Sequence, residues 1–198
     1  MRVTIFDYGA GNLHSLSKAI ANEGTELRVE DDPTEAVKTD LLVLPGVGAF
    51  TTAAERLGSG RTAMRDALLA GLPCLGICLG MQLLMDESEE GPGSGLGVIM
   101  GKVRKLRTKR IPQIGWNEIA SERDPVFEKA PLGVAYFANS FVCDPSDESS
   151  VIAWSTHEND RFPAAVRREN VVGVQFHPEK SSAAGLAFVR AFIEQARP

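Results

Sequence analysis

Gly76-Ile77-Cys78-Leu79-Gly80 joins an apolar run to a helix-like run, and this junction decides the fold. Residues 72–77 are typical of a buried strand, and residues 79–87 are expected to form a helix. A cysteine between two glycines in a strand-to-helix turn matches the G-x-nucleophile-x-G elbow, with Cys in place of Ser. The glycines lack the Cβ atoms that would clash in so tight a bend. The pattern predicts an exposed, reactive thiol at Cys78.

A second interpretation of Cys78 is purely structural. Free cysteines are among the most buried residue types, and glycines also occur at ordinary strand-to-helix turns. The position favours reactivity, because the partial positive charge at the N-terminus of the following helix stabilises a thiolate. The elbow alone does not choose between a packed and a reactive thiol, so a base has to be found elsewhere in the chain.

The composition limits the class of protein. The chain has 198 residues, 43% of them hydrophobic and 24% charged, which is ordinary for a globular protein. A formal net charge of -5 argues against nucleic-acid binding. The three cysteines are an odd number without zinc-ligand spacing, so we expect no disulfide framework, metal or cofactor. With no signal peptide and no apolar run near the ~20 residues that span a bilayer, we expect a cytoplasmic protein without membrane contact.

One segment departs from the acidic average. Six basic residues gather between positions 102 and 110: Lys102, Arg104, Lys105, Arg107, Lys109 and Arg110. Such a run is usually a solvated loop or strand face. The alternative is that it attracts an acidic partner or a phosphorylated ligand.

Strand-like and helix-like segments alternate in the first half of the chain. The expected strands are 3–7, 27–30, Leu41–Leu44 and 72–77, and the expected helices are 12–23, 62–70 and 79–87. This rhythm predicts a parallel sheet with helices on both faces. The second half has strand-like segments with short connections, followed by the helix Ser182–Gln195: 97–106, 133–142, 151–155, 164–168 and 171–176. We therefore expect one α/β domain over residues 1–198, a three-layer open mixed sheet, mostly parallel, with an antiparallel extension.

A base for Cys78 has to come from three histidines: His14, His157 and His177. His14 lies on the first expected helix, and His157 lies in a polar stretch expected to be a surface turn. His177 follows a buried strand, and Pro178 keeps it extended, so its side chain lies on the same side as that of Glu179. A carboxylate there can hold one imidazole nitrogen and direct the other at the thiol. The alternative is a histidine in a capping turn beside a solvated glutamate.

Two glycine-containing loops also follow strands. Pro45-Gly46-Val47-Gly48 is expected at the carboxyl edge of the sheet, where its backbone N–H groups, with that of Leu79, can bind a developing oxyanion. As a bare motif it can also be only a turn. Asp7-Tyr8-Gly9-Ala10-Gly11-Asn12 resembles the start of a dinucleotide loop, but His14 occupies the third glycine position, which disfavours that interpretation.

Taken together, these motifs resemble a known family. Gly76-Ile77-Cys78-Leu79-Gly80-Met81-Gln82 and Gln175-Phe176-His177-Pro178-Glu179 resemble the triad (class I) glutamine amidotransferases, which hydrolyse glutamine and pass the ammonia to a synthase. Further segments resemble the glutaminase subunits of imidazole glycerol phosphate synthases: Asp7-Tyr8-Gly9-Ala10-Gly11-Asn12-Leu13, Pro45-Gly46-Val47-Gly48-Ala49-Phe50, Ile114-Gly115-Trp116-Asn117 and His177-Pro178-Glu179-Lys180-Ser181. The resemblance covers nearly the whole chain.

The resemblance implies roles for individual residues. It makes Cys78 the nucleophile, His177 the general base and later acid, and Glu179 its orienting carboxylate. Backbone positions of the oxyanion hole match Val47, Gly48 and Leu79. Positions that hold the substrate glutamine match Gly46, Gln82, Ser140 and Phe141. Positions that face the partner match Asn12, Trp116, Asn117 and Lys180.

The resemblance also implies a partner and a pathway. L-glutamine is the expected substrate, and a (β/α)₈ cyclase is the expected partner in a heterodimer of histidine biosynthesis. An isolated subunit of this family is expected to be nearly inactive, because the oxyanion hole forms fully only when the partner is loaded. Val47, between two glycines, is a suitable hinge for that change.

The chain departs from the family pattern at two places. Asn139-Ser140-Phe141 stands where the family usually has His-Ser-Tyr, and Pro112-Gln113 stands where it often has Pro-His. Three rival functions remain: a glutaminase for another synthase, such as the pyridoxal phosphate complex; a cysteine hydrolase that acts alone; and an inactive binding subunit. The intact triad speaks against the last.

Overall fold

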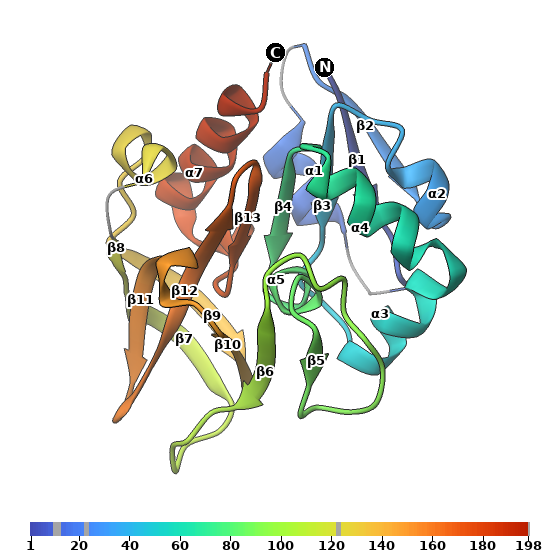
Figure 1. Ribbon diagram of the computed structural model, residues 1–198. Coiled ribbons are helices and arrows are strands. Elements are labelled where there is room, and N and C mark those ends of the chain that lie inside the picture. The colour runs from blue at the N-terminus through green and yellow to red at the C-terminus, as the bar shows by residue number, and fades with distance from the viewer. Residues whose placement is uncertain (10–12, 22–23, 122–123, 198) are drawn as a thin grey trace.

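A large mixed sheet forms the centre of the computed structural model, which describes residues 1–9, 13–21, 24–121 and 124–197 (Figure 1). Its strands are β1 (Arg2–Phe6), β2 (Glu26–Glu30), β3 (Leu41–Leu44), β4 (Cys74–Ile77), β8 (Ala120–Ser121), β11 (Val151–His157), β12 (Asp160–Arg168) and β13 (Val171–Val174). Over the described residues the order is β2-β1-β3-β4-β13-β12-β11-β8. The pairs from β2 to β13 are parallel, and those from β13 to β8 are antiparallel. The predicted mixed sheet with an antiparallel extension is confirmed.

Helices cover both faces of this sheet (Figure 1). One face carries α1 (His14–Ile20), α6 (Pro125–Lys129) and α7 (Ser182–Gln195). The other carries α2 (Pro33–Ala36), α3 (Phe50–Leu57), α4 (Arg61–Leu69) and α5 (Leu79–Leu83). Successive residues of β3 alternate between the two cores, with Leu41 and Val43 on the first face and Leu42 and Leu44 on the second. Because each fully buried aliphatic side chain contributes about 2 kcal/mol, a continuous apolar run is stable only between two layers.

Two smaller sheets extend the large one. The first joins β5 (Glu87–Ser88), β6 (Gly101–Lys105) and β10 (Phe141–Pro145), and the second is a ribbon of β7 (Gln113–Glu118) and β9 (Val134–Asn139). The expectation of one strand over 133–142 is wrong, because the chain breaks at Ser140 and pairs with β7 before it and with β6 after it. Hydrophobic alternation reports which face is buried, but it does not report which strand is the neighbour.

The helix expected over 79–87 is also shorter than the pattern suggests. It ends at Leu83, and the amides of Leu84 and Met85 bond to carbonyls only three residues back. The Asp86 amide then donates to the Gly101 carbonyl, which carries the chain into the β5–β6 sheet. The apolar residues after α5 are therefore buried between elements rather than along one helix face. The strand β7 and the short helices α2, α3 and α6 had no predicted counterpart.

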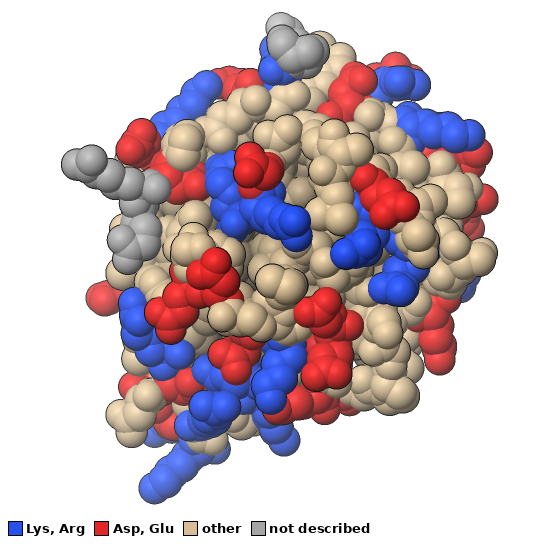
Figure 2. Space-filling view, in the orientation of Figure 1, with Lys and Arg blue, Asp and Glu red and all other residues tan. Residues whose placement is uncertain are grey.

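The basic segment 102–110 turns one of its side chains inward. Arg104 is 5% exposed and forms a bidentate ion pair with Asp160, with both N–O distances 2.8 Å. The expectation of a wholly solvated basic run is therefore wrong at Arg104. Figure 2 shows acidic and basic side chains intermingled on the displayed face, with basic side chains projecting at its lower edge, where the β6–β7 loop lies in Figure 1.

Replacing Asp160 by asparagine is expected to lower the free energy of unfolding by about 3 kcal/mol at neutral pH, because the Arg104 charge stays buried. Burial raises the pKa of Asp160, but hydrogen bonds from Arg104 and the Arg107 amide outweigh it and lower the pKa below its usual range. A carboxyl whose pKa is lowered on folding stabilises the folded state at pH values above its unfolded pKa of about 3.9. This contribution is lost as the pH falls through the folded-state pKa. Urea unfolding should therefore show a smaller difference in the free energy of unfolding between variant and wild type at acid pH than at neutral pH.

The control is Asp144→Asn. Asp144 lies 4.0 Å from the same arginine, but its side chain is 46% exposed. We expect a change within about 0.5 kcal/mol for this variant, because exposed ion pairs contribute little. Equal losses in the two variants would contradict the assignment of the buried pair.

Candidate active site

Cys78 lies in the turn between β4 and α5, two elements that are near the centre of Figure 1. Its backbone has φ 47° and ψ -102°, a strained conformation for a residue with a Cβ atom. A Cβ added at Gly80 would lie 2.1 Å from the Leu44 carbonyl oxygen, and one at Gly76 would lie 2.7 Å from the Gly80 oxygen. The bend is therefore possible only with glycine on both sides of Cys78. The predicted exposure of the thiol is wrong, because Cys78 is 7% exposed and buried at the sheet edge.

His177 and Glu179 lie side by side just beyond β13. The distance from His177 Nδ1 to Glu179 Oε1 is 2.9 Å, and the imidazole residue is 2% exposed. Pro178 begins the short 3₁₀ helix η3 (Pro178–Lys180), and the Ser181 hydroxyl donates to the His177 carbonyl at 2.7 Å. These contacts hold the imidazole with one nitrogen on the carboxylate and the other free to face the thiol.

The charge on His177 follows from its neighbours. Burial lowers its pKa, but hydrogen bonds to Cys78 and Glu179 and the negative charge of both groups outweigh burial and raise the pKa to about 9. The imidazole is therefore protonated at neutral pH and hydrogen-bonds to the Cys78 sulfur. Such a pair can attack an electrophilic carbon and then protonate a leaving amine.

The segment 45–48 lies against this pair, as the sequence predicted. A Cβ built at Gly46 would lie 3.0 Å from His177 Cε1 and from the Ile77 carbonyl oxygen. Val47 is half-buried and Gly48 is exposed, and Leu79 directly follows the thiol. Gly46 and Leu79 thus lie beside the catalytic pair, and Val47 and Gly48 follow Gly46 in the loop after β3.

Three of the four positions predicted to hold a substrate lie on α5 and where β9 leads into β10. Gln82, on α5, is 5% exposed, and its Nε2 donates to the Phe141 carbonyl at 3.1 Å. Ser140 and Phe141 are half-buried where β9 leads into β10. The site therefore draws on three separate sheets and on α5.

Comparison with known proteins decides the family. The family model described as glutamine amidotransferase class-I matches residues 4–196. The chain belongs to the class I glutamine amidotransferases. The resemblance predicted from its motifs is confirmed.

Curated relatives agree with this assignment, and solved structures share the fold. The amidotransferase is 40% identical over 205 residues to imidazole glycerol phosphate synthase subunit HisH of Bacillus subtilis, covering 98% of this chain and 96% of that protein. It is 42% identical over 194 residues to the subunit of the same name from Pyrococcus furiosus, covering 96% and 97%. Two Thermotoga maritima structures share the fold at 19% identity. The structure of PurLQS has a TM-score of 0.72 and covers 99% of this chain and 99% of that one. A glutamine amidotransferase has a TM-score of 0.69 and covers 98% of this chain and 83% of that one.

The predicted partner positions of the amidotransferase lie on and beside the β7–β9 ribbon. Trp116 is 56% exposed and meets Tyr136 edge-on, with ring centroids 6.2 Å apart. Lys180 Nζ lies 5.9 Å from the same tyrosine ring. Asn117 donates to the Thr156 carbonyl at 2.9 Å, so it also holds the ribbon to β11. Asn12 lies outside the described residues.

Sequence reasoning missed two residues near the site. Tyr136 lies between Trp116 and Lys180, and its carbonyl accepts from the His177 amide at 2.8 Å. Gln175, fully buried, directs its side chain at Cys78. Both stood in recognisable patterns, since Tyr136 is in an alternating strand and Gln175 is two residues before His177. The other two histidines lie elsewhere, on α1 and at the end of β11.

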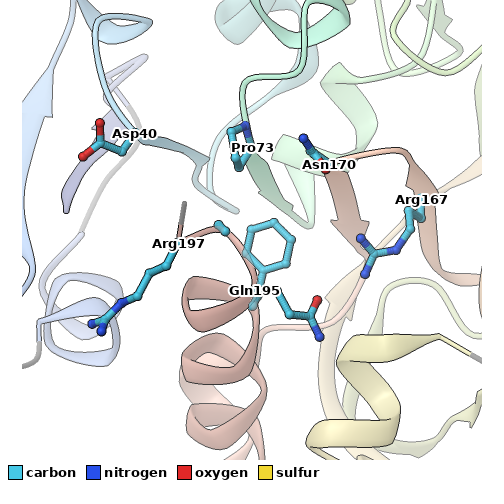
Figure 3. Close-up of a pocket in the computed structure, with 8 residues that line it drawn as sticks. Asp40, Pro73, Arg167, Asn170, Gln195 and Arg197 are labelled. Carbon is cyan, nitrogen blue, oxygen red and sulfur yellow. The ribbon is translucent and has the colours of Figure 1, made fainter.

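A separate cavity of about 410 Å³ opens at the amino ends of the strands, at the sheet edge opposite Cys78 (Figure 3). Asp40, Pro73 and Asn170 line it, each just before a strand. Two of its polar side chains are engaged within the protein: Arg167 forms a bidentate pair with Asp124 at 2.5 and 2.8 Å, and the Asn170 amide donates to the Gly71 carbonyl. This cavity therefore has no part in the chemistry at Cys78.

The described residues contain no cluster of three or more His, Cys, Asp or Glu side chains with metal-binding geometry. None of the helices in this part of the chain combines the length and the apolarity needed to cross a bilayer.

Proposed function

We propose that this amidotransferase is the glutaminase subunit of an imidazole glycerol phosphate synthase and hydrolyses L-glutamine to glutamate and ammonia in histidine biosynthesis. The observation that carries the proposal is the pairing of a strained cysteine elbow with the His177–Glu179 pair at 2.9 Å. The full-length relatives from Bacillus subtilis and Pyrococcus furiosus, at 40% and 42% identity, support the choice of synthase.

In this proposal the Cys78 thiolate attacks the side-chain amide carbon of glutamine. The oxygen that becomes negative is held by backbone amides of Val47 or Gly48 and of Leu79, where one lost donor typically costs about 3 kcal/mol of transition-state stabilisation. His177 gives its proton to the departing amine, so ammonia leaves and a glutamyl thioester remains. His177 then takes a proton from water, which hydrolyses the thioester to glutamate and restores the thiol. Glu179 keeps the imidazole oriented throughout.

We assign substrate binding to Gly46, Gln82, Ser140 and Phe141. Gln82 is held by the Phe141 carbonyl, so α5 and the start of β10 form one wall beside Cys78. On the opposite side, the close approach of Gly46 to His177 leaves no room for a side chain. We propose that the side-chain amide of glutamine binds between these two walls.

We place the partner on the outward face of the β7–β9 ribbon. Three apolar side chains there are 67%, 56% and 46% exposed, namely Ile114, Trp116 and Val134. In the ribbon register, Trp116 stands opposite Tyr136, and Ile114 stands opposite Ala138. Exposed apolar patches of this kind mark interaction surfaces. The partner that we propose is a (β/α)₈ cyclase in a heterodimer, with Asn117 and Lys180 at the rim. Asn12, the remaining predicted partner position, lies outside the described residues.

The ribbon also touches the catalytic histidine. The Tyr136 carbonyl accepts from the His177 amide, so a partner that moves the ribbon acts directly on the site. We propose that this contact and a hinge at Val47 keep the isolated chain nearly inactive until the cyclase is loaded, and that the ammonia passes into the cyclase. The chain would work as one domain in the cytoplasm, which agrees with three free thiols at Cys74, Cys78 and Cys143.

The test is ammonia production from glutamine by the purified chain, alone and with its cognate cyclase and ribonucleotide ligand. We expect low turnover alone and a large rise with the loaded partner. Full-rate hydrolysis of amides or peptides by the chain alone would instead support a cysteine hydrolase without a channel. Activation by a different synthase would overturn the choice of partner.

Trp116→Ala tests the docking face, with Met100→Ala as its control. Both side chains are apolar and exposed, at 56% and 66%, but Met100 precedes β6 and lies off the ribbon. Loss of a central aromatic anchor is expected to weaken cyclase binding by at least about tenfold, as for other interface anchors. The control should bind within about twofold of wild type. Equal weakening in both variants would contradict the assigned face.

A further inference from the structure

A row of hydrogen-bonded, buried side-chain amides leads to the nucleophile. Gln175 Nε2 lies 3.4 Å from Cys78 Sγ, and Gln175 Oε1 lies 3.4 Å from Gln82 Nε2. Gln82 Nε2 also lies 3.1 Å from the Phe141 carbonyl oxygen. Gln175 is fully buried and Gln82 is 5% exposed. The reaction proposed above makes no use of Gln175.

The direction of the hydrogen bonds along this row of amides is set by the Phe141 carbonyl. A backbone carbonyl can only accept, so the Gln82 atom that faces the Phe141 oxygen has to be the NH₂ group. The same NH₂ group faces Gln175, which therefore presents its carbonyl oxygen to Gln82. The only orientation left for Gln175 turns its NH₂ group towards the sulfur. The orientation of both amides thus follows from the hydrogen-bond network.

The backbone keeps Gln175 in place. Its amide N–H donates to the Ala164 carbonyl at 2.9 Å, which extends the pairing of β12 and β13, and the Cys78 amide donates to the preceding Val174 carbonyl at 2.6 Å. The nucleophile and the amide that faces it are therefore fixed to adjacent strand ends. Asn139 Nδ2 also donates to the Phe141 carbonyl at 3.1 Å, which holds the Phe141 end of the row of amides in place.

We propose that Gln175 stabilises the Cys78 thiolate through an N–H group, which the hydrogen bonds among Phe141, Gln82 and Gln175 direct at its sulfur. A donor aimed at the charged form of a group favours that form. The imidazolium of His177 supplies one donor to the sulfur, and Gln175 supplies a second from a different strand end. Gln175 therefore sets the fraction of reactive thiolate and holds the sulfur still for attack.

This inference rests on Cys78 as the nucleophile of the proposed function, and it can be tested without glutamine. The rate of alkylation of the native chain by iodoacetamide, followed against pH, reports thiolate formation. Burial raises the pKa of the Cys74 and Cys143 thiols far above their usual range, so these two cysteines stay unreactive. The pH midpoint of alkylation therefore reports Cys78.

Gln175→Met removes the donor while keeping the length of the side chain. We expect the pH midpoint of Cys78 alkylation to rise by about one unit, the size of one hydrogen bond to a charged group. Gln175→Asn keeps a polar amide in the core but draws it back by one methylene, so it should shift the midpoint in the same direction. If the inward amide served only packing or polarity, Asn would leave the midpoint unchanged.

Gln113→Met is the matched control. Gln113 is 4% exposed, and within the described residues its side-chain nitrogen and oxygen have no hydrogen-bond partner, so the same substitution removes no contact to the sulfur. Its midpoint should equal that of wild type. Thermal unfolding of each variant shows whether it is folded, and if the Gln175→Met chain is not, the Gln175→Asn midpoint decides.

Kinetics of the complex with the cyclase give a second measure. For both Gln175 variants kcat for glutamine should fall by about tenfold near neutral pH with KM unchanged, and the loss should shrink at higher pH as the thiolate forms anyway. Unchanged midpoints in both variants, or an equal shift in Gln113→Met, would overturn the role of Gln175 and leave the proposed function standing. A wild-type Cys78 that reacts no faster than a free thiol would overturn the proposed nucleophile itself, and this inference with it.

Discussion

Cys78→Ala lowers glutamine hydrolysis by the chain and its cyclase by at least about 10⁴-fold, because no other side chain at the elbow can form the thioester. The fold should survive, because alanine and cysteine carry the same Cβ atom and meet the same strain at φ 47°. Ammonia release and labelling by a glutamine-like electrophile measure the two halves of the prediction. The variant should release no ammonia above background and take up no label.

Cys74→Ala is the matched control for this variant. Cys74 begins the same strand, β4, and is fully buried in the core under α4. Its loss is expected to cost about 1 kcal/mol of stability through a small cavity, with activity within about twofold of wild type. A Cys78→Ala complex that keeps more than about one per cent of the activity would remove Cys78 from the mechanism.

Glu179→Gln is expected to lower kcat by about 10² to 10³-fold and to move the alkaline limb of the pH–rate profile downwards. The Glu179 carboxylate is one of the groups that raise the pKa of His177 to about 9. Without its charge the pKa of His177 falls, so the imidazolium that protonates the leaving amine is lost at a lower pH. The profile of kcat for the loaded complex should therefore break well below the wild-type limb near pH 9.

Glu158→Gln controls for the loss of a carboxylate beside a histidine. Glu158 follows His157 in the turn between β11 and β12, where it accepts from the Lys109 amide at 2.8 Å. Its alkaline limb should match that of wild type. An alkaline limb that stays in place in Glu179→Gln would show that His177 does not depend on this carboxylate.

The fold was predictable where chemistry within a few residues decides the structure. The alternation of strands and helices up to α5 follows from apolar runs bounded by glycines, and it yielded the parallel strands β1 to β4 correctly. It missed α2 and α3, and it did not show that β13, from the second half of the chain, pairs parallel to β4. The antiparallel half was predicted as a class but not in detail. One expected strand divided at Ser140 between two sheets, because the choice of neighbour depends on segments far away in the chain.

The candidate site was likewise predictable only in part. The elbow at Cys78 and the pairing of His177 with Glu179 follow from glycine sterics and from extended backbone at Pro178, and the sequence named all three residues. Tyr136 and Gln175 were missed, although both lie in patterned segments. Nothing in those patterns states that a tyrosine carbonyl holds the catalytic histidine or that a glutamine faces the thiol.

By itself, then, the sequence determined the strand–elbow–helix unit, the imidazole–carboxylate pair and the family, because each depends on neighbours in the chain. Only the tertiary structure decided that Gln175 faces Cys78 across 97 positions and that Arg104 is buried against Asp160 across 56. The physical reason is that burial and hydrogen bonding between distant segments are settled only when the sheet assembles.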